Sequence, residues 1–202
     1  MKKLMMCFLI GILLIGTAAC GNKTAEKDAT AQFKNSVFMG DSITEGFAVN
    51  EILPNESVMA GAGATAGYIY EEYIDDLAEK KPDNVFIMLG SDDMLMPVDD
   101  PKALFESDLT KLINKIKEEV PNAKIYLQSI APVTQEALKQ EPRYERIEEY
   151  NELLKELTGK LSINYVDIGA LAKENHNLFA EDGVHFKKEF YQLWLKKLSE
   201  SL

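Results

Sequence analysis

The sequence predicts an α/β domain in which a parallel sheet is covered by helices on both faces. Two observations lead to this fold class. Short apolar runs rich in Val, Ile, Phe and Tyr alternate along the chain with longer stretches of helical periodicity. Each short run is continuously apolar rather than alternating, which is typical of strands buried on both faces. Strands that alternate with helices in this way form parallel sheets.

The individual elements follow from the same pattern. The predicted strands are Val37–Met39, Ser57–Met59, Val85–Leu89, Ile125–Leu127 and Ile163–Ile168. The clearest helix has a carboxylate that can cap it, followed by proline at the first helical position. The predicted helices run from Asp100-Pro101 to Pro121, from Tyr144 to Gly159 and from Phe186 to Leu198.

The N-terminal residues have the pattern of a bacterial lipoprotein signal. Lys2 and Lys3 precede an apolar run over residues 4–15, which is too short to span a bilayer comfortably. Small residues and then Cys20 follow, which resembles a lipobox whose cleavage leaves the cysteine to carry lipid. The alternative is an ordinary secretory cleavage near Ala19.

This signal divides the chain into three parts. We expect residues 1–19 to be the signal peptide, 20–34 a lipidated cysteine with a flexible polar tether, and 35–202 one domain of typical size. The protein would then lie outside the cytoplasm, anchored to the cell membrane. Cys7 and Cys20 both fall outside the domain, which therefore has no disulfide, no thiol nucleophile and no cysteine metal ligand.

The charge of the chain excludes nucleic acid as a partner. There are 22 Lys and Arg against 33 Asp and Glu, a formal net charge of −11, and loss of the two signal-peptide lysines makes it −13. Such a surface repels phosphate backbones and anionic lipid headgroups. Membrane attachment would therefore depend on the lipid at Cys20.

A serine directly after the first predicted strand is a candidate nucleophile. Ser42 ends a Gly-Asp-Ser tripeptide, where a strand-to-helix turn can present its hydroxyl at the sheet edge. Serine needs a base to remove its proton. His185 lies three residues after Asp182, which can orient the imidazole as in a Ser-His-Asp triad. His176 has no such partner and is predicted to be a surface residue. The alternative interpretation is that the Gly-Asp-Ser motif is a plain turn and that the segment with Asp182 and His185 is a solvated loop.

With these motifs, residues 35–202 resemble an SGNH/GDSL hydrolase. The segments that match the family's blocks are 40–44 (GDSIT), 61–67, 90–93 and 182–185. The resemblance implies a three-layer α/β/α sandwich of the flavodoxin-like type with a five-stranded parallel sheet. It also implies hydrolysis of esters or thioesters through an acyl-enzyme, with neither a metal ion nor an organic cofactor.

The resemblance further implies an oxyanion hole built from the Ser42 and Gly63 N–H groups and a side chain at position 92. The family has asparagine there, but this chain has Asp92, and an ionised carboxylate repels a developing oxyanion. Three alternatives stay open: a protonated Asp92 that donates its O–H, the two N–H groups acting alone, or an offset alignment in which Ser91 or another group donates. A fourth alternative is that Asp92 only caps the turn that follows it.

Three side chains are candidates for substrate contact. Met94 and Met96 follow the third block, where adaptable methionines can line an acyl pocket, and Tyr68 can stack on a sugar ring. Ordinary packing also explains all three. The sequence thus predicts an esterase for small acyl groups, such as acetyl on cell-surface carbohydrate. The alternatives are a lipase, lysophospholipase or thioesterase for longer chains, and a non-catalytic lipoprotein that binds glycan or lipid.

Overall fold

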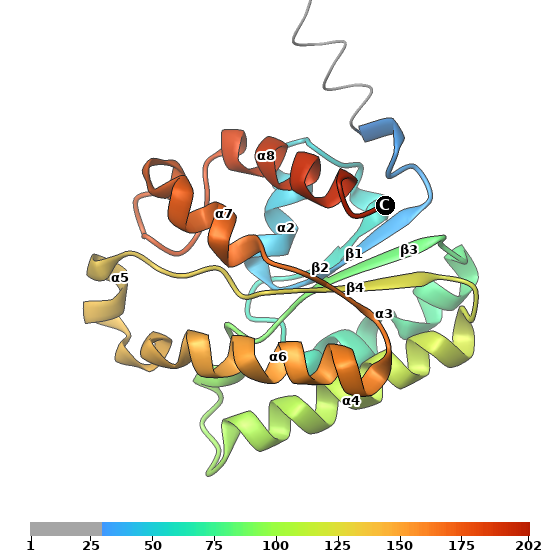
Figure 1. Cartoon of the computed structure of the whole chain (residues 1–202), viewed down its shortest axis with the longest axis horizontal. Coiled ribbons are helices and arrows are strands. Elements are labelled where there is room, and N and C mark those ends of the chain that lie inside the picture. The colour runs from blue at the N-terminus through green and yellow to red at the C-terminus, as the bar shows by residue number, and fades with distance from the viewer. Residues whose placement is uncertain (1–29) are drawn as a thin grey trace, which may run out of the picture.

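The computed structural model describes residues 30–202. The predicted signal peptide and Cys20 lie outside these residues. Five parallel strands form one sheet in the order β2-β1-β3-β4-β5 (Figure 1). The strands are β1 (Ser36–Gly40), β2 (Val58–Ala60), β3 (Asn84–Met88), β4 (Lys124–Gln128) and β5 (Asn164–Val166).

Helices cover both faces of the sheet, so the predicted three-layer α/β/α class is confirmed (Figure 1). One face carries α3 (Ala66–Lys80), α4 (Pro101–Glu119) and α6 (Ile147–Leu161). The other carries α2 (Ser42–Val49), α7 (Ile168–Glu174) and α8 (Lys188–Ser199). The short elements in the connections are α5 (Gln135–Gln140), η1 (Asn55–Ser57), η2 (Asp93–Leu95), η3 (Pro142–Arg146) and η4 (His176–Leu178).

All five predicted strands are present, with one clear difference in their bounds. The last strand was expected to continue to Ile168, but β5 ends at Val166. The reason is local, because Asp167 caps the next helix and accepts the Ala170 N–H at 3.0 Å. The predicted start of α4 is confirmed, while α3, α5 and α7 are helices that the sequence pattern did not indicate.

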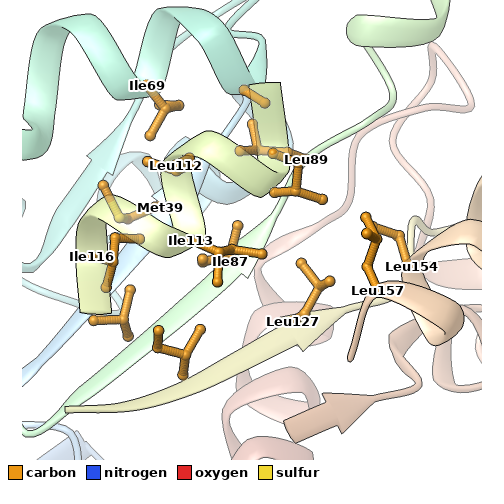
Figure 2. Close-up of a cluster of buried hydrophobic side chains, with 14 of the residues drawn as sticks. Met39, Ile69, Ile87, Leu89, Leu112, Ile113, Ile116, Leu127, Leu154 and Leu157 are labelled. Atoms are coloured by element: carbon orange, nitrogen blue, oxygen red, sulfur yellow. The ribbon is translucent and has the colours of Figure 1, made fainter. Parts of the chain in front are cut away.

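The core is split by the sheet because successive strand residues point to opposite faces. Val37 and Met39 of β1 pack with α3, α4 and α6 in an aliphatic cluster, part of which Figure 2 shows. Phe38 points to the other face and stacks on Phe86, with ring centroids 4.9 Å apart. Trp194 of α8 completes this aromatic cluster.

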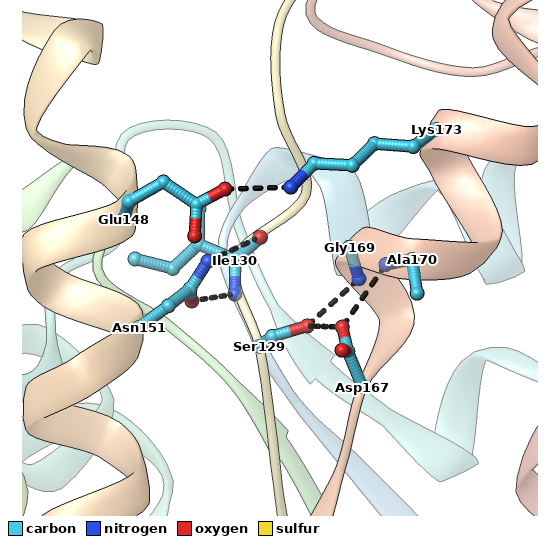
Figure 3. Close-up of polar contacts among 8 residues, drawn as sticks. All are labelled: Ser129, Ile130, Glu148, Asn151, Asp167, Gly169, Ala170 and Lys173. Carbon is cyan, nitrogen blue, oxygen red and sulfur yellow. Dashed lines mark hydrogen bonds and ion pairs between the residues drawn. The ribbon is translucent and has the colours of Figure 1, made fainter.

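A polar network fixes the segment that follows β4 (Figure 3). The Asn151 side chain of α6 accepts the Ile130 N–H at 2.8 Å and donates to the Ile130 carbonyl at 3.1 Å. The Ser129 hydroxyl donates to Asp167 at 3.0 Å and accepts the Gly169 N–H at 2.7 Å. The connection from β4 to α5 is therefore held from two sides.

Residues 30–202 contain neither a membrane-spanning helix nor a cluster of metal-ligand side chains. None of the helices in this range has the length and apolar character needed to cross a bilayer. The same range contains no group of three or more His, Cys, Asp or Glu side chains arranged to hold a metal ion.

Candidate active site

Ser42 is the first residue of α2, and Asp41 alone separates it from the end of β1. The turn that presents it is tight, since a Cβ on Gly40 would lie 2.4 Å from the Met88 carbonyl oxygen. Only glycine fits at that position. Asp41 caps the helix by accepting the Ile43 N–H at 2.9 Å. The turn therefore places the Ser42 hydroxyl at the carboxyl edge of the sheet, where parallel α/β folds bind ligands.

The structure brings Ser42, His185 and Asp182 together in the order that a Ser-His-Asp triad requires. His185 Nε2 lies 2.8 Å from Ser42 Oγ, and His185 Nδ1 lies 2.6 Å from Asp182 Oδ2. With Nδ1–H donated to the carboxylate, Nε2 is the ring nitrogen that accepts a proton. The geometry suits removal of the serine proton by the imidazole.

The Asp182 carboxylate is held within its own loop. Its Oδ1 accepts the N–H groups of Val184 and His185, each at 2.9 Å. Partial burial raises the pKa of Asp182, but the hydrogen bonds from Val184 and His185 outweigh it, and the pKa is lowered overall. An ionised carboxylate beside Nδ1 keeps the imidazole in one tautomer and stabilises its protonated form.

A residue that the sequence pattern did not indicate holds this loop from outside. The Thr134 N–H, at the start of α5, donates to the Gly183 carbonyl at 2.9 Å. Gly183 has φ of +72°, and a Cβ on it would lie 2.0 Å from Thr134 Oγ1. Glycine is thus required at position 183 for two reasons, its backbone conformation and the close approach of the Thr134 side chain. The contact joins segments far apart in the chain, so no local signal could have found it.

The candidate oxyanion donors come from the ends of three neighbouring strands. The Ser42 N–H belongs to the first turn of α2, where backbone donors have no intrahelical acceptor. Gly63 follows β2 with φ of +74°, and its N–H has no hydrogen-bond partner within residues 30–202. Asp92 follows β3 and is half-buried. The two N–H groups are therefore available to an oxyanion.

The surroundings of Asp92 argue against its role as a plain cap and against donation by Ser91. Its side chain makes no capping hydrogen bond to η2, so it is not a plain cap. Ser91 is not a free donor, because its hydroxyl donates to the buried Asp41 carboxylate. Burial raises the pKa of Asp92, and the charge of a protonated His185 opposes that rise. A protonated Asp92 donor and catalysis by the N–H groups alone both remain compatible with this geometry.

Two buried carboxyl groups beneath the site were not indicated by the sequence. Burial raises the pKa of Asp41 to about 6, although the Ser91 hydroxyl lowers it. Burial likewise raises the pKa of Asp93 to about 7, although the Ala66 N–H, donated to Oδ1 at 2.9 Å, lowers it. Asp93 Oδ2 has no partner among the described residues. Asp93 links the η2 segment to the first turn of α3, next to the Gly63 loop.

The candidate substrate residues are placed differently from one another. Met94 is 1% exposed and packs inside the aliphatic core, so its predicted contact with substrate is not supported. Met96 is half-buried beside it. Tyr68 is 47% exposed near the start of α3 and meets Tyr73 edge-on, with ring centroids 6.4 Å apart. His176 is exposed in η4, as expected.

Solved structures with the same architecture include a lipase, a lipase/acylhydrolase and an acetylxylan esterase. A GDSL-like lipase from Bacteroides thetaiotaomicron has a TM-score of 0.69 at 18% identity, covering 90% of this chain and 96% of its own. The lipase/acylhydrolase from Enterococcus faecalis has a TM-score of 0.65 at 18% identity, covering 83% and 95%. A catalytic mutant of an acetylxylan esterase from Geobacillus stearothermophilus has a TM-score of 0.61 at 20% identity, covering 81% and 91%.

These likenesses by themselves establish the fold. No curated protein matches the chain. The sequence does match the GDSL-like lipase/acylhydrolase family over residues 38–193, which include the serine, histidine and aspartate described above. The chain belongs to the GDSL-like lipase/acylhydrolase family and is a carboxylic ester hydrolase.

Proposed function

We propose that this protein is an extracytoplasmic serine esterase, anchored through lipid on Cys20, that removes acetyl groups from cell-surface carbohydrate. The observation that carries the proposal is the hydrogen-bonded series Ser42–His185–Asp182. The acetylxylan esterases among the similar structures support an acetylated sugar as substrate. The lipoprotein pattern of the first 20 residues supports the location.

The reaction follows from the positions of these side chains. His185 Nε2 takes the proton of the Ser42 hydroxyl as Oγ attacks the ester carbonyl carbon. The N–H groups of Ser42 and Gly63 stabilise the tetrahedral oxyanion. His185 then gives its proton to the departing alcohol oxygen, which leaves an acyl-Ser42 ester. A water molecule, deprotonated by His185, attacks that ester and releases the carboxylic acid and the serine.

A fluorophosphonate probe tests whether the serine is activated. We expect the probe to label wild-type protein and to leave Ser42→Ala unlabelled, because the probe reacts only with a nucleophilic serine. Ser36→Ala is a matched control, since Ser36 is a buried serine in β1 away from the triad. A folded wild-type protein that takes up no label would instead identify a non-catalytic binding protein.

Two further measurements address substrate and location. A series of p-nitrophenyl esters should show highest kcat/KM for acetyl, whereas a maximum at long acyl chains would make the protein a lipase or thioesterase. Metabolic labelling with a fatty acid should mark the full-length protein in bacterial cells and should be lost in Cys20→Ser. Absence of label on the wild type would contradict the anchor.

A further inference from the structure

A groove of about 540 Å³ lies along the outer edge of the sheet, between α2 and the edge strand β2. We call it the edge groove. It is lined by Glu45, Ala48, Val49, Glu51, Asn55, Val58 and Ala60. None of these residues belongs to the catalytic series or to the candidate oxyanion hole.

Two residues that line the edge groove, Ala60 and Glu45, lie close to the nucleophile along the strand and the helix that carry them. Ala60 pairs with Gly40, two residues before Ser42, and Gly63 follows Ala60 in the chain. Glu45 lies one turn of α2 after Ser42. The helix rise of about 1.5 Å per residue then places Val49, further along the groove, about 10 Å from the nucleophile along the axis. A substrate must extend well beyond its ester group to fill the groove.

Backbone groups at the strand edge add a donor to the groove. The Gly61 N–H donates to Gly40 of β1. Peptide groups point alternately to the two sides of a strand, so those of Ala60 point outward, and the Ala60 carbonyl indeed accepts the Tyr73 hydroxyl at 3.2 Å. The Ala60 N–H is thus at the unpaired edge of the sheet.

The chemistry of the groove favours an uncharged ligand rich in hydroxyl groups. The carboxylates of Glu45 and Glu51 form no ion pair within residues 30–202, so they are free to accept hydrogen bonds. They also repel phosphate and fatty-acid headgroups. Ala48 and Val49, the latter 73% exposed, supply a small apolar surface rather than a channel for an acyl chain.

We propose that the edge groove binds the sugar units of an oligosaccharide beyond the unit that carries the acetyl ester, with Glu51 accepting hydrogen bonds from its hydroxyls. This proposal rests on the proposed esterase function. It adds a dependence on chain length, because a single acetylated sugar held at Ser42 does not extend to Glu51, which follows the C-terminal end of α2.

Glu51→Gly is a sharp test of this proposal. Glu51 has φ of +57°, a conformation that glycine adopts freely, so the variant removes the carboxylate without straining the backbone. The substrates are O-acetylated monomers and tetramers of xylose and of N-acetylglucosamine, with p-nitrophenyl acetate as the short reference. We expect kcat/KM for the preferred tetramer to fall about 3- to 10-fold, the range for one lost hydrogen bond, with the monomer and reference rates unchanged.

Two matched variants complete the experiment. Ser162→Gly makes the same change at another left-handed residue, at the end of α6, and should leave all rates unchanged. Ala48→Phe fills the groove and should reduce the tetramer rate at least about tenfold, whereas Ala170→Phe, at an exposed residue of α7, should not.

The outcomes separate the two proposals. If wild-type protein hydrolyses no ester, the esterase function itself fails. If it hydrolyses p-nitrophenyl acetate but shows equal kcat/KM for monomer and tetramer of both sugars, or if Glu51→Gly and Ala48→Phe affect all esters alike, the edge groove is not a sugar subsite. A tetramer preference that disappears in high salt would assign the groove to a cationic ligand and would overturn the proposal.

Discussion

The buried carboxyl group of Asp93 makes the stability of this protein depend on pH. Asp93 is 4% exposed, and one of its oxygens has no partner among the described residues. Burial raises its pKa from 3.8 to about 7 in the folded protein. In the unfolded chain the group ionises near its ordinary pKa. The folded state therefore binds a proton more tightly than the unfolded state does.

The sign and size of the effect follow from this difference. Below about pH 4 the group is protonated in both states and costs nothing. Between pH 4 and 7 only the unfolded chain ionises, so the free energy of unfolding falls as pH rises, and above pH 7 the full cost is present. One pKa unit corresponds to about 1.4 kcal/mol. The gap from 3.8 to about 7 therefore corresponds to a loss of about 4 kcal/mol, an upper value because water entry and relaxation reduce it.

Asp93→Asn removes this titration and keeps an oxygen that can accept the Ala66 N–H. We expect the difference in unfolding free energy, variant minus wild type, to rise by about 2–4 kcal/mol between pH 4 and pH 8. Urea denaturation at both pH values measures it through the midpoint, with the slope unchanged. Packing differences between the two side chains do not depend on pH, so they cancel in this comparison.

Asp99→Asn, at an exposed aspartate, is the control for the chemical change itself. A stability difference for Asp93→Asn that stays the same at pH 4 and pH 8 would refute the reasoning. The buried carboxyl would then be hydrated or paired in solution rather than neutral.

Two further predictions concern the loop of the histidine and the oxyanion hole. Thr134→Pro should lower kcat about 10- to 100-fold, because it removes the N–H bound to Gly183 at a residue whose φ of −70° already suits proline. Thr134→Ala loses only the helix cap and should keep kcat within about threefold. Equal kcat values in the two variants would contradict the role of the Thr134 N–H in holding the loop. Asp92→Asn should retain or raise esterase kcat, because an amide N–H restores a donor to the oxyanion hole. The rise should reach up to about 10²-fold if the wild-type carboxylate is ionised. A collapse of kcat in a folded variant would show that the carboxyl group itself contributes.

Much of the fold was predictable because its signals are local. Continuous apolar runs marked all five strands, and Asp100-Pro101 marked the start of α4. Helix α3 was not predicted because its N-cap, Thr65, lies in a glycine-rich segment that resembled a loop motif. The end of β5 was misjudged because an apolar residue, Ile168, begins the next helix rather than continuing the strand.

Some features of the candidate site could likewise be predicted from the sequence and others could not. The residue types of the triad, and the spacing of Asp182 and His185, could be read from the chain because each motif is short and follows an element with a clear pattern. The burial of Met94 and the high pKa of Asp93 could not, since both depend on which segments pack around them.

The sequence by itself determined the order of the strands, the family and the three side chains proposed to perform the chemistry, because periodicity, caps and short motifs act between near neighbours. Tertiary structure alone decided that His185 Nε2 lies 2.8 Å from Ser42 Oγ, that Thr134 holds the loop of Asp182, and that a groove lies between α2 and β2. These distances arise when the sheet brings the ends of separate strands to one edge. Packing of the whole core therefore sets them, and no single segment specifies them.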